Sequence, residues 1–232
     1  MAILIPPSRV FPPVEQADED GLLAIGGELE PAWLLDAYMH GVFPWPFGSD
    51  SQPMAWWSPD PRGVLELDGL HISRPLRRTL RQGRFEVSCD RAFREVMAAC
   101  ATGPGRLGGT WITPRMIEAY TRLHRLGFAH SVEARRDGRL VGGVYGVSIR
   151  GLFAAESKFY RERDASKVAL ACLVAHLRAS GFLLLDLQMV TSHTKRLGAI
   201  EISREEYLDR LAGALEQDVT FGERLLVQAE DF

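Results

Sequence analysis

The chain has little cysteine and no long apolar run. Its 232 residues include three cysteines, Cys89, Cys100 and Cys172, too few and too scattered for a disulfide framework. No Cys-x-x-Cys pair occurs, which argues against a zinc knuckle, and a reducing compartment suits this composition. No apolar stretch approaches the roughly 20 residues that span a bilayer. Residues 1–7 are too short and proline-rich for a secretory signal. We therefore expect a cytoplasmic protein with no membrane partner and no metal.

Common motifs for nucleotides and nucleophiles are also missing. There is no Walker loop, Gly-x-Ser-x-Gly or His-Glu-x-x-His, and the glycine pairs at 26–27, 108–109 and 142–143 lack dinucleotide-binding spacing. We expect no cofactor. The formal net charge of −3 creates no global attraction for nucleic acid, so an RNA site has to be a local patch. The length suits one large domain or two modest ones.

The first half of the chain mixes loops with short helices. Residues 1 to about 30 indicate an extended lead-in, Pro31 opens a short helix that ends at Gly41, and 42–63 indicate a structured loop region with three tryptophans. A strand is expected at about 64–70. Further helices are expected at 74–82, 91–101 and 114–126, the last behind an N-cap at Thr113.

In the second half, the periodicity changes to that of an antiparallel meander. Strands at 130–136 and 139–149 flank Asp137-Gly138, a strong hairpin signal. The following elements are a strand at 152–159, a helix at 165–179, a strand at 183–188, a helix at 192–197, a strand at 199–202, and a final helix with a capping box of Ser203 and Glu206. This α+β order predicts a small N-terminal domain, 1–64, and an acetyltransferase-like (GNAT-like) domain, 65–232, with a mainly antiparallel sheet.

A carboxylate interrupts the apolar strand LLLDLQ at 183–188. On a regular strand Asp186 and Gln188 share one face. An ionised carboxylate there is costly unless it is paired or hydrogen-bonded, which favours a functional role. The alternative is a strand end that reaches solvent, where Asp186 caps a turn.

Five arginines between residues 74 and 84 form a basic stripe. The predicted helix at 74–82 carries arginines at i, i+3, i+4 and i+7, with another just after it: Arg74, Arg77, Arg78, Arg81 and Arg84. No acidic residue interrupts 71–85, and Leu76 and Leu80 anchor the opposite face. Phosphate binding explains such a stripe, and a solvated helix face is the alternative.

Several separate motifs occur in the order of one family. They are FPW at 43–45, WWSPDPR at 56–62, GTWIT at 109–113, GGVYG at 142–146, GLFAAES at 151–157, DASK at 164–167 and HTKRLGA at 193–199. With the strand that holds Asp186, the chain resembles the bacterial leucyl/phenylalanyl-tRNA–protein transferases from about Gly21 to about Leu211.

This resemblance implies an activity and a site. Leucine or phenylalanine would pass from aminoacyl-tRNA to proteins with N-terminal Arg or Lys, by aminolysis of an ester, and mark them for degradation. Glu156 would hold the α-amino group of the transferred residue, and the arginine helix would contact tRNA. Trp45, Trp111 and Phe153 would line an apolar pocket open to the terminal adenosine. We expect Val144, Ala155, Leu170, Leu173, Leu177 and Leu185 to complete it, with leucine fitting at least as well as phenylalanine.

The resemblance also assigns roles at Asp186 and Gln188. Asp186 would polarise Gln188, which contacts the attacking amine. Because glutamine is not a base, we favour Asp186 as an electrostatic anchor and Gln188 as the group that orients the amine. The proton would leave to water or to the ribose hydroxyl of the tRNA. Asp186 and Glu156 are also expected to recognise the cationic acceptor side chain.

Three alternatives stay open at this point. A coenzyme A-dependent acetyltransferase needs a pyrophosphate loop, and the nearest candidate, Arg139-x-x-Gly142-x-Val144, ends wrongly and lies in a predicted strand. A non-catalytic RNA-binding protein leaves the carboxylates unexplained. A peptidoglycan-type aminoacyl transferase shares the donor but not the acceptor. His193, a lone histidine, is expected to be structural.

Overall fold

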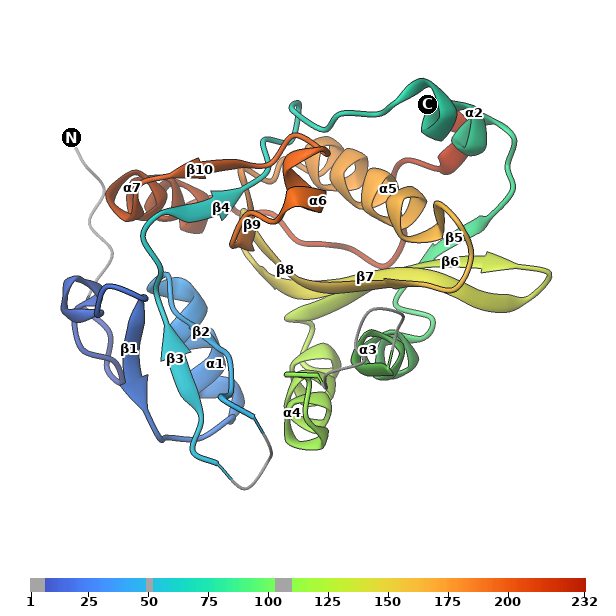
Figure 1. Ribbon diagram of the computed structural model, residues 1–232. Coiled ribbons are helices and arrows are strands. Elements are labelled where there is room, and N and C mark those ends of the chain that lie inside the picture. Colours follow the sequence, from blue (N-terminus) through green and yellow to red (C-terminus); the bar gives the residue numbers. More distant parts are fainter. Residues whose placement is uncertain (1–6, 49–51, 103–109) are drawn as a thin grey trace.

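The computed structural model describes residues 7–48, 52–102 and 110–232. A small N-terminal part lies beside a larger sheet covered by helices on both faces (Figure 1). The N-terminal part consists of η1 (Val14–Gln16), β1 (Leu22–Ile25), α1 (Pro31–Met39), β2 (Phe43–Pro44) and β3 (Ala55–Trp57), with strand order β1-β3-β2. The expected lead-in and loop region thus contain strands. These strands, of two to four residues, are too short for a periodicity to reveal.

The larger sheet has seven strands in the order β10-β4-β9-β8-β7-β6-β5. Their bounds are β4 Arg62–Val64, β5 Glu86–Cys89, β6 Ala129–Arg136, β7 Arg139–Ile149, β8 Leu152–Tyr160, β9 Leu184–Gln188 and β10 Ile200–Ile202. Neighbours are antiparallel except β8 and β9, which are parallel and joined by helix α5 (Ala165–Ala179). The α+β class, the small N-terminal part and the mainly antiparallel sheet are therefore as predicted.

Helices cover both faces of this sheet. Besides α5, they are α2 (Arg74–Arg81), α3 (Phe93–Thr102), α4 (Pro114–Arg125), α6 (Ser192–Lys195) and α7 (Arg204–Leu215), followed by η2 (Ala229–Asp231). α5 packs on one face and α3 and α4 on the other (Figure 1). The core on the α3/α4 face includes Met97 and Leu123 and continues into the N-terminal part through Leu34 and Trp56. The N-terminal part is therefore anchored by shared apolar packing.

Two local predictions were wrong. The strand expected at 64–70 lies earlier, as β4, because Arg62–Val64 pairs with β9 on one side and β10 on the other. At α7, Ser203 Oγ accepts the N–H of Glu206 at 3.1 Å, but the Glu206 carboxylate accepts from Arg210 at 2.6 Å. The capping box is therefore only half formed.

Some predictions lie outside this description. Residues 1–6 of the lead-in and Gly108 and Gly109 fall outside the described residues. The domain boundary near residue 64 stays a prediction. Within the described ranges, no helix is long and apolar enough to cross a membrane.

Candidate active site

Asp186 is buried on β9 and paired with Arg62 on β4. The guanidinium donates to both carboxylate oxygens, Nε to Oδ1 at 3.0 Å and Nη2 to Oδ2 at 2.7 Å. Asp186 is 0% and Arg62 1% exposed. The Tyr207 hydroxyl donates to Oδ2 at 3.0 Å, and Arg62 Nη1 donates to the Gly41 carbonyl at 2.8 Å. A fully buried carboxylate thus has an ionic partner and further hydrogen bonds.

This pair is an ionised unit closed off from water. Burial lowers the pKa of Arg62 and is the largest single effect, but the charge of Asp186, its hydrogen bonds and the neighbouring Tyr207 and Glu156 together outweigh it, so the pKa of Arg62 is raised. The pKa of Tyr207 is raised by burial and by Asp186, so its hydroxyl stays protonated. The guanidinium also lies over the rings of Phe43 and Tyr207, at 4.9 and 4.4 Å. Asp186 therefore acts through fixed neighbours and has no direct opening to solvent.

Gln188 does not share a regular strand face with Asp186. The register between β4 and β9 shifts at this point, with Val64 opposite Asp186 and Gly63 opposite Gln188. Gln188 has a φ of +60°, a left-handed conformation uncommon outside glycine. Its N–H donates to Asp186 Oδ1 at 2.8 Å. Bulges and strained residues of this kind concentrate at functional sites, where they redirect a side chain.

The Gln188 side chain is held by backbone groups rather than by the Asp186 carboxylate. With the amide oriented so that its nitrogen rather than its oxygen faces them, the side chain donates to the carbonyls of Ala155 at 3.1 Å and Leu187 at 3.0 Å. Within the described part of the chain, no hydrogen bond joins this side chain to the Asp186 carboxylate, and the expected polarisation stays a prediction. Asp186 instead fixes the backbone of Gln188 through the N–H, and the amide oxygen is the acceptor that this side chain offers.

Glu156 lies on β8 among hydroxyl groups. Tyr38 donates to Oε1 at 2.7 Å, Tyr120 lies 3.4 Å from Oε2, and the two phenols are 2.5 Å apart. Burial raises the pKa of Glu156 to about 8, against the opposing effect of the Tyr38 hydrogen bond. The pKa of each tyrosine is raised mainly by burial. Glu156 thus changes its charge close to neutral pH, whereas the carboxylate of Asp186 forms an ion pair with a guanidinium.

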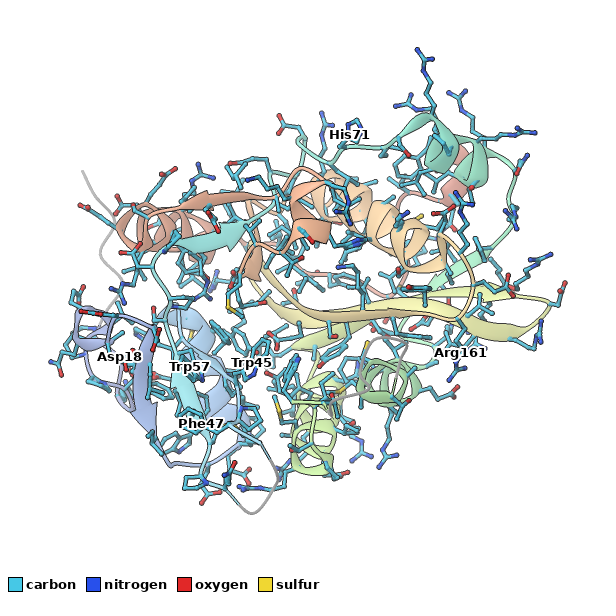
Figure 2. All side chains as sticks on the ribbon, viewed as in Figure 1. Asp18, Trp45, Phe47, Trp57, His71 and Arg161 are labelled. Carbon is cyan, nitrogen blue, oxygen red and sulfur yellow. The ribbon has the colours of Figure 1, made fainter. Side chains whose placement is uncertain are left out.

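A cavity of about 260 Å³ lies between the two parts of the chain. Its lining residues are Trp45, Leu65, Trp111, Val144, Ala155, Glu156, Ser157, Lys158, Leu170, Leu187, Gln188, Met189, Thr191, Thr194 and Leu197. Trp45 and Trp111 stack on each other, with centroids 4.8 Å apart. Figure 2 shows Trp45 at the side of the N-terminal part that faces the large sheet. The volume is below the ~300–1,000 Å³ of pockets for drug-sized ligands, so it suits a single amino-acid unit.

The structure brings together only some of the predicted pocket residues. Trp45, Trp111, Val144, Ala155 and Leu170 line this cavity with Glu156 and Gln188. Asp186 lies behind the wall, and four others pack in the core on the α5 face: Phe153, Leu173, Leu177 and Leu185.

The reason is geometric. Leu173 and Leu177 continue the apolar stripe of α5 one and two turns past Leu170, and they are not among the residues that line the cavity. Phe153 and Leu185 are register partners inside the sheet. Their assignment to the acyl site stays a prediction.

The arginine stripe lies on α2 as predicted. Leu76 and Leu80 are buried, whereas Arg74, Arg77, Arg78, Arg81 and Arg84 are exposed. Arg81 Nε donates to the Phe232 carbonyl. No ion pair is found for these five arginines within the described part of the chain. The stripe is therefore available to an anionic partner.

Four site residues were not predicted from sequence. Arg62 lies inside the WWSPDPR motif but had no assigned role, and Tyr38, Tyr120 and Tyr207 come from three separate helices. The only sequence signal was indirect, because a buried Asp186 requires a cation somewhere. Among the described residues, no group of three or more His, Cys, Asp or Glu side chains is placed to hold a metal ion.

Two family models match the chain. One described as leucyl/phenylalanyl-tRNA protein transferase covers residues 64–212, and one described as the N-terminal domain of that transferase covers residues 27–60. The first model includes Asp186, Gln188 and Glu156, and the second includes Trp45.

Relatives with this name align over most of their length. The leucyl/phenylalanyl-tRNA–protein transferase of Aromatoleum aromaticum is 58% identical over 204 residues, 87% of this chain and 85% of that protein. The protein of this name from Pseudomonas putida (KT2440) is 54% identical over 212 residues, 90% of this chain and 93% of that protein. Among solved structures, L-PGS from Bacillus licheniformis aligns with a TM-score of 0.45 and 10% identity, covering 81% of this chain and 71% of that chain. The chain therefore belongs to the leucyl/phenylalanyl-tRNA–protein transferase family.

Proposed function

We propose that this protein transfers leucine or phenylalanine from aminoacyl-tRNA to the N-terminus of a protein that begins with Arg or Lys. The observation that carries the proposal is the position of Glu156 and Gln188 together on the wall of a small cavity that is otherwise mainly apolar. An α-amino acid ester needs an apolar site for its side chain and an anion for its ammonium. Both lie within this one cavity.

The donor binds through these two features. Leu65, Val144, Leu170 and Leu187 provide aliphatic walls for the side chain, so leucine fits at least as well as phenylalanine. Glu156 accepts the donor ammonium and becomes ionised as it does so, because a nearby positive charge favours the carboxylate. The two tryptophans stack on each other, so the terminal adenosine stacks on the outer face of the pair.

The reaction is ester aminolysis. The acceptor's α-amino nitrogen attacks the ester carbonyl carbon, a C–N bond forms, and the C–O bond to the ribose breaks. The proton of the attacking nitrogen ends on the ribose oxygen, directly or through water. Because the ester is already activated, the protein chiefly has to align the reactants. The Gln188 amide oxygen accepts an N–H of the attacking amine and orients its lone pair.

Asp186 serves this step as a positioning residue. Its carboxylate fixes the backbone of Gln188 at the bulge through the 2.8 Å hydrogen bond. Its own charge is matched by Arg62, so it is poorly suited to bind the acceptor's cationic side chain.

A second hollow suits the acceptor's side chain better. It measures about 200 Å³ and is lined by Asp20, Phe43, Trp45, Trp57, Pro59 and Met189, of which Trp45 and Met189 also line the acyl cavity. Aromatic faces and one carboxylate favour a lysine or arginine side chain. We place the acceptor's first residue there.

The remaining roles follow from the donor. The exposed arginines of α2 bind tRNA phosphates. Each such contact releases counterions condensed on the RNA, and this release favours binding. A cytoplasmic enzyme fits this donor, and the new N-terminal leucine or phenylalanine marks the acceptor for degradation.

The test uses tRNA charged with radiolabelled leucine and two peptides that differ only in an N-terminal Arg or Ala. Label is expected to move to the Arg peptide alone. Transfer to neither peptide, with tRNA binding intact, would favour a non-catalytic RNA-binding protein. Transfer to a peptidoglycan-type amine but to neither peptide would favour the other aminoacyl transferase class.

A further inference from the structure

A further cavity, on the basic side of the molecule, has no assigned role. It measures about 410 Å³ and is lined by His71, Ser73, Leu76, Lys167, His193, Arg196 and Leu197. Its residues come from the segment before α2, from α2, from the start of α5, and from α6 with the segment after it. Figure 2 shows His71 on the segment that leads to α2, beside α5.

The position of this cavity links two sites already described. Leu197 lines both it and the acyl cavity, while Leu76 belongs to the helix that carries the arginine stripe. The Leu197 carbonyl also accepts the N–H of His71 at 2.9 Å, which fixes the two segments together. An RNA strand whose end enters the acyl cavity and whose body lies on α2 has to pass this place.

The charges in the cavity have one sign. Lys167 and Arg196 line it directly, and Lys158 lies in the wall of the acyl cavity next to it. The pKa of His193 is lowered by partial burial and by these three cations, which places them around the imidazole. Among the described residues, the one carboxylate that contacts these cations is Asp164, which lies 2.9 Å from Lys167 Nζ and holds that side chain in place.

The N-terminal end of α2 offers few free backbone N–H groups to an anion. Ser73 Oγ already accepts the Leu76 N–H at 3.4 Å, and Pro75 has no N–H. Any anion in the cavity therefore has to be bound chiefly by the side chains of Lys167, Arg196 and His193. Lysine and arginine are the common ligands of a phosphate oxygen, and an uncharged histidine can still donate one hydrogen bond.

We propose that this cavity binds the last phosphodiester of the donor's single-stranded 3′ end, with Lys167, Arg196 and His193 as its ligands. The phosphodiester links the terminal adenosine to the preceding nucleotide. Its capture holds the ester in register with Glu156 and Gln188. This inference rests on the proposed function and adds a phosphate subsite distinct from the α2 stripe.

The test compares two minimal donors that differ by this group. One is the leucyl ester of adenosine, which has no phosphate, and the other is the leucyl ester of cytidylyl-(3′→5′)-adenosine, which has one. The wild-type protein is expected to use the dinucleotide ester with a kcat/KM roughly tenfold higher, as for one charge-assisted contact. Arg196→Ala and Lys167→Ala are each expected to reduce that advantage several-fold.

Arg178→Ala is the matched control, because Arg178 is an exposed cation on α5 outside this cavity. It is expected to leave the advantage unchanged. The proposal is overturned if the ratio of kcat/KM between the two esters is unchanged in the Arg196 and Lys167 variants. It is also overturned if these variants lose the same factor in kcat/KM on both esters.

Intact leucyl-tRNA provides the second measurement. Here the two substitutions are expected to raise KM by roughly tenfold with kcat kept, and an unchanged KM overturns the proposal. Failure of the proposed function looks different, because the wild-type protein would then transfer leucine from none of the three donors.

Discussion

Two regions of the molecule, one at the acyl cavity and one on the surface around α2, differ in burial and in charge. In the acidic inner region, Asp186 is buried and Glu156 is half-buried, and each has at least two hydrogen-bond partners. On the basic outer side, the arginines of α2 and Arg196 are exposed and have few partners. An exposed charged side chain is solvated by water and needs no ionic partner, whereas a buried charge is strongly destabilising unless it is paired. Changes inside should therefore affect stability and catalysis together, and changes outside should affect RNA binding alone.

The two inner carboxylates also differ from each other. Asp186 forms a buried ion pair with a guanidinium, whereas Glu156 lies among phenol hydroxyls and has a pKa raised to about 8. In the part of the chain that the structure describes, the same chemical group thus has a cationic partner in one place and faces the cavity without one in the other.

Asp186→Ala should have the largest effect. Turnover is expected to fall roughly 100-fold or more, because Gln188 loses the hydrogen bond that sets its backbone. Tight tRNA binding should remain. Stability is expected to drop by about 3–5 kcal/mol, because Arg62 is left buried without a partner. Steady-state transfer assays and urea unfolding measure the two effects, and unchanged turnover would refute the assigned role.

A double variant separates these two effects. Arg62→Met with Asp186→Leu replaces the buried pair by apolar groups of similar size, which often restores stability. We expect unfolding close to wild type and turnover still low. Recovery of turnover in the double variant would mean that Asp186 serves the fold alone.

Arg77→Glu combined with Arg78→Glu should have the next largest effect. Affinity for tRNA is expected to fall by roughly 10–100-fold, and the salt dependence should flatten by about one power of salt per lost phosphate contact. Arg125→Glu with Arg178→Glu changes the same charge at two other exposed positions. If both double variants bind tRNA equally well, the α2 stripe is only a solvated face.

Glu156→Gln should weaken donor use by roughly tenfold, because a charge-assisted hydrogen bond to the ammonium is lost. It should also change the pH dependence of stability. The folded-state pKa of about 8 lies above the ordinary value of 4.5, so the folded protein keeps a proton that the unfolded chain has lost. This contribution is fully present below pH 4.5 and is lost as the pH rises through about 8.

Denaturant unfolding from pH 5 to pH 8.5 measures this effect. The wild-type free energy of unfolding should fall by a few kcal/mol more than that of Glu156→Gln across the range. Parallel curves for the two proteins would show that Glu156 is ionised throughout.

Tyr38→Phe should have the smallest effect. The Tyr38 hydrogen bond lowers the pKa of Glu156, so its loss should raise that pKa further. The rise of donor kcat/KM with pH is then expected to move to higher pH, with a several-fold loss at neutral pH. Tyr160→Phe removes a hydroxyl from an exposed tyrosine and should leave the profile in place. A profile that does not move in Tyr38→Phe would separate this tyrosine from Glu156.

Local signals in the sequence predicted much of the fold. Helix α5 has the predicted bounds, and the hairpin turns at Asp137-Gly138 as its dipeptide requires. The α2 stripe was readable because i, i+3 and i+4 spacing is set by the helix itself. The short strands of the N-terminal part were missed, because two to four residues carry no periodicity.

Some features of the site can likewise be predicted from local sequence, whereas others cannot. The positions of Asp186 and Glu156 within apolar strands, and the gathering of arginines on one helix, follow from neighbours along the chain. The partnership of Asp186 with Arg62, 124 residues earlier, and the contact of Tyr38 with Glu156 arise only when the chain is folded. Packing in the folded chain also sets where the cavity ends, so that Leu170 lines it and Leu173 does not. Pairing across a sheet and packing between helices join residues far apart in the chain, and no local spacing encodes which ones meet.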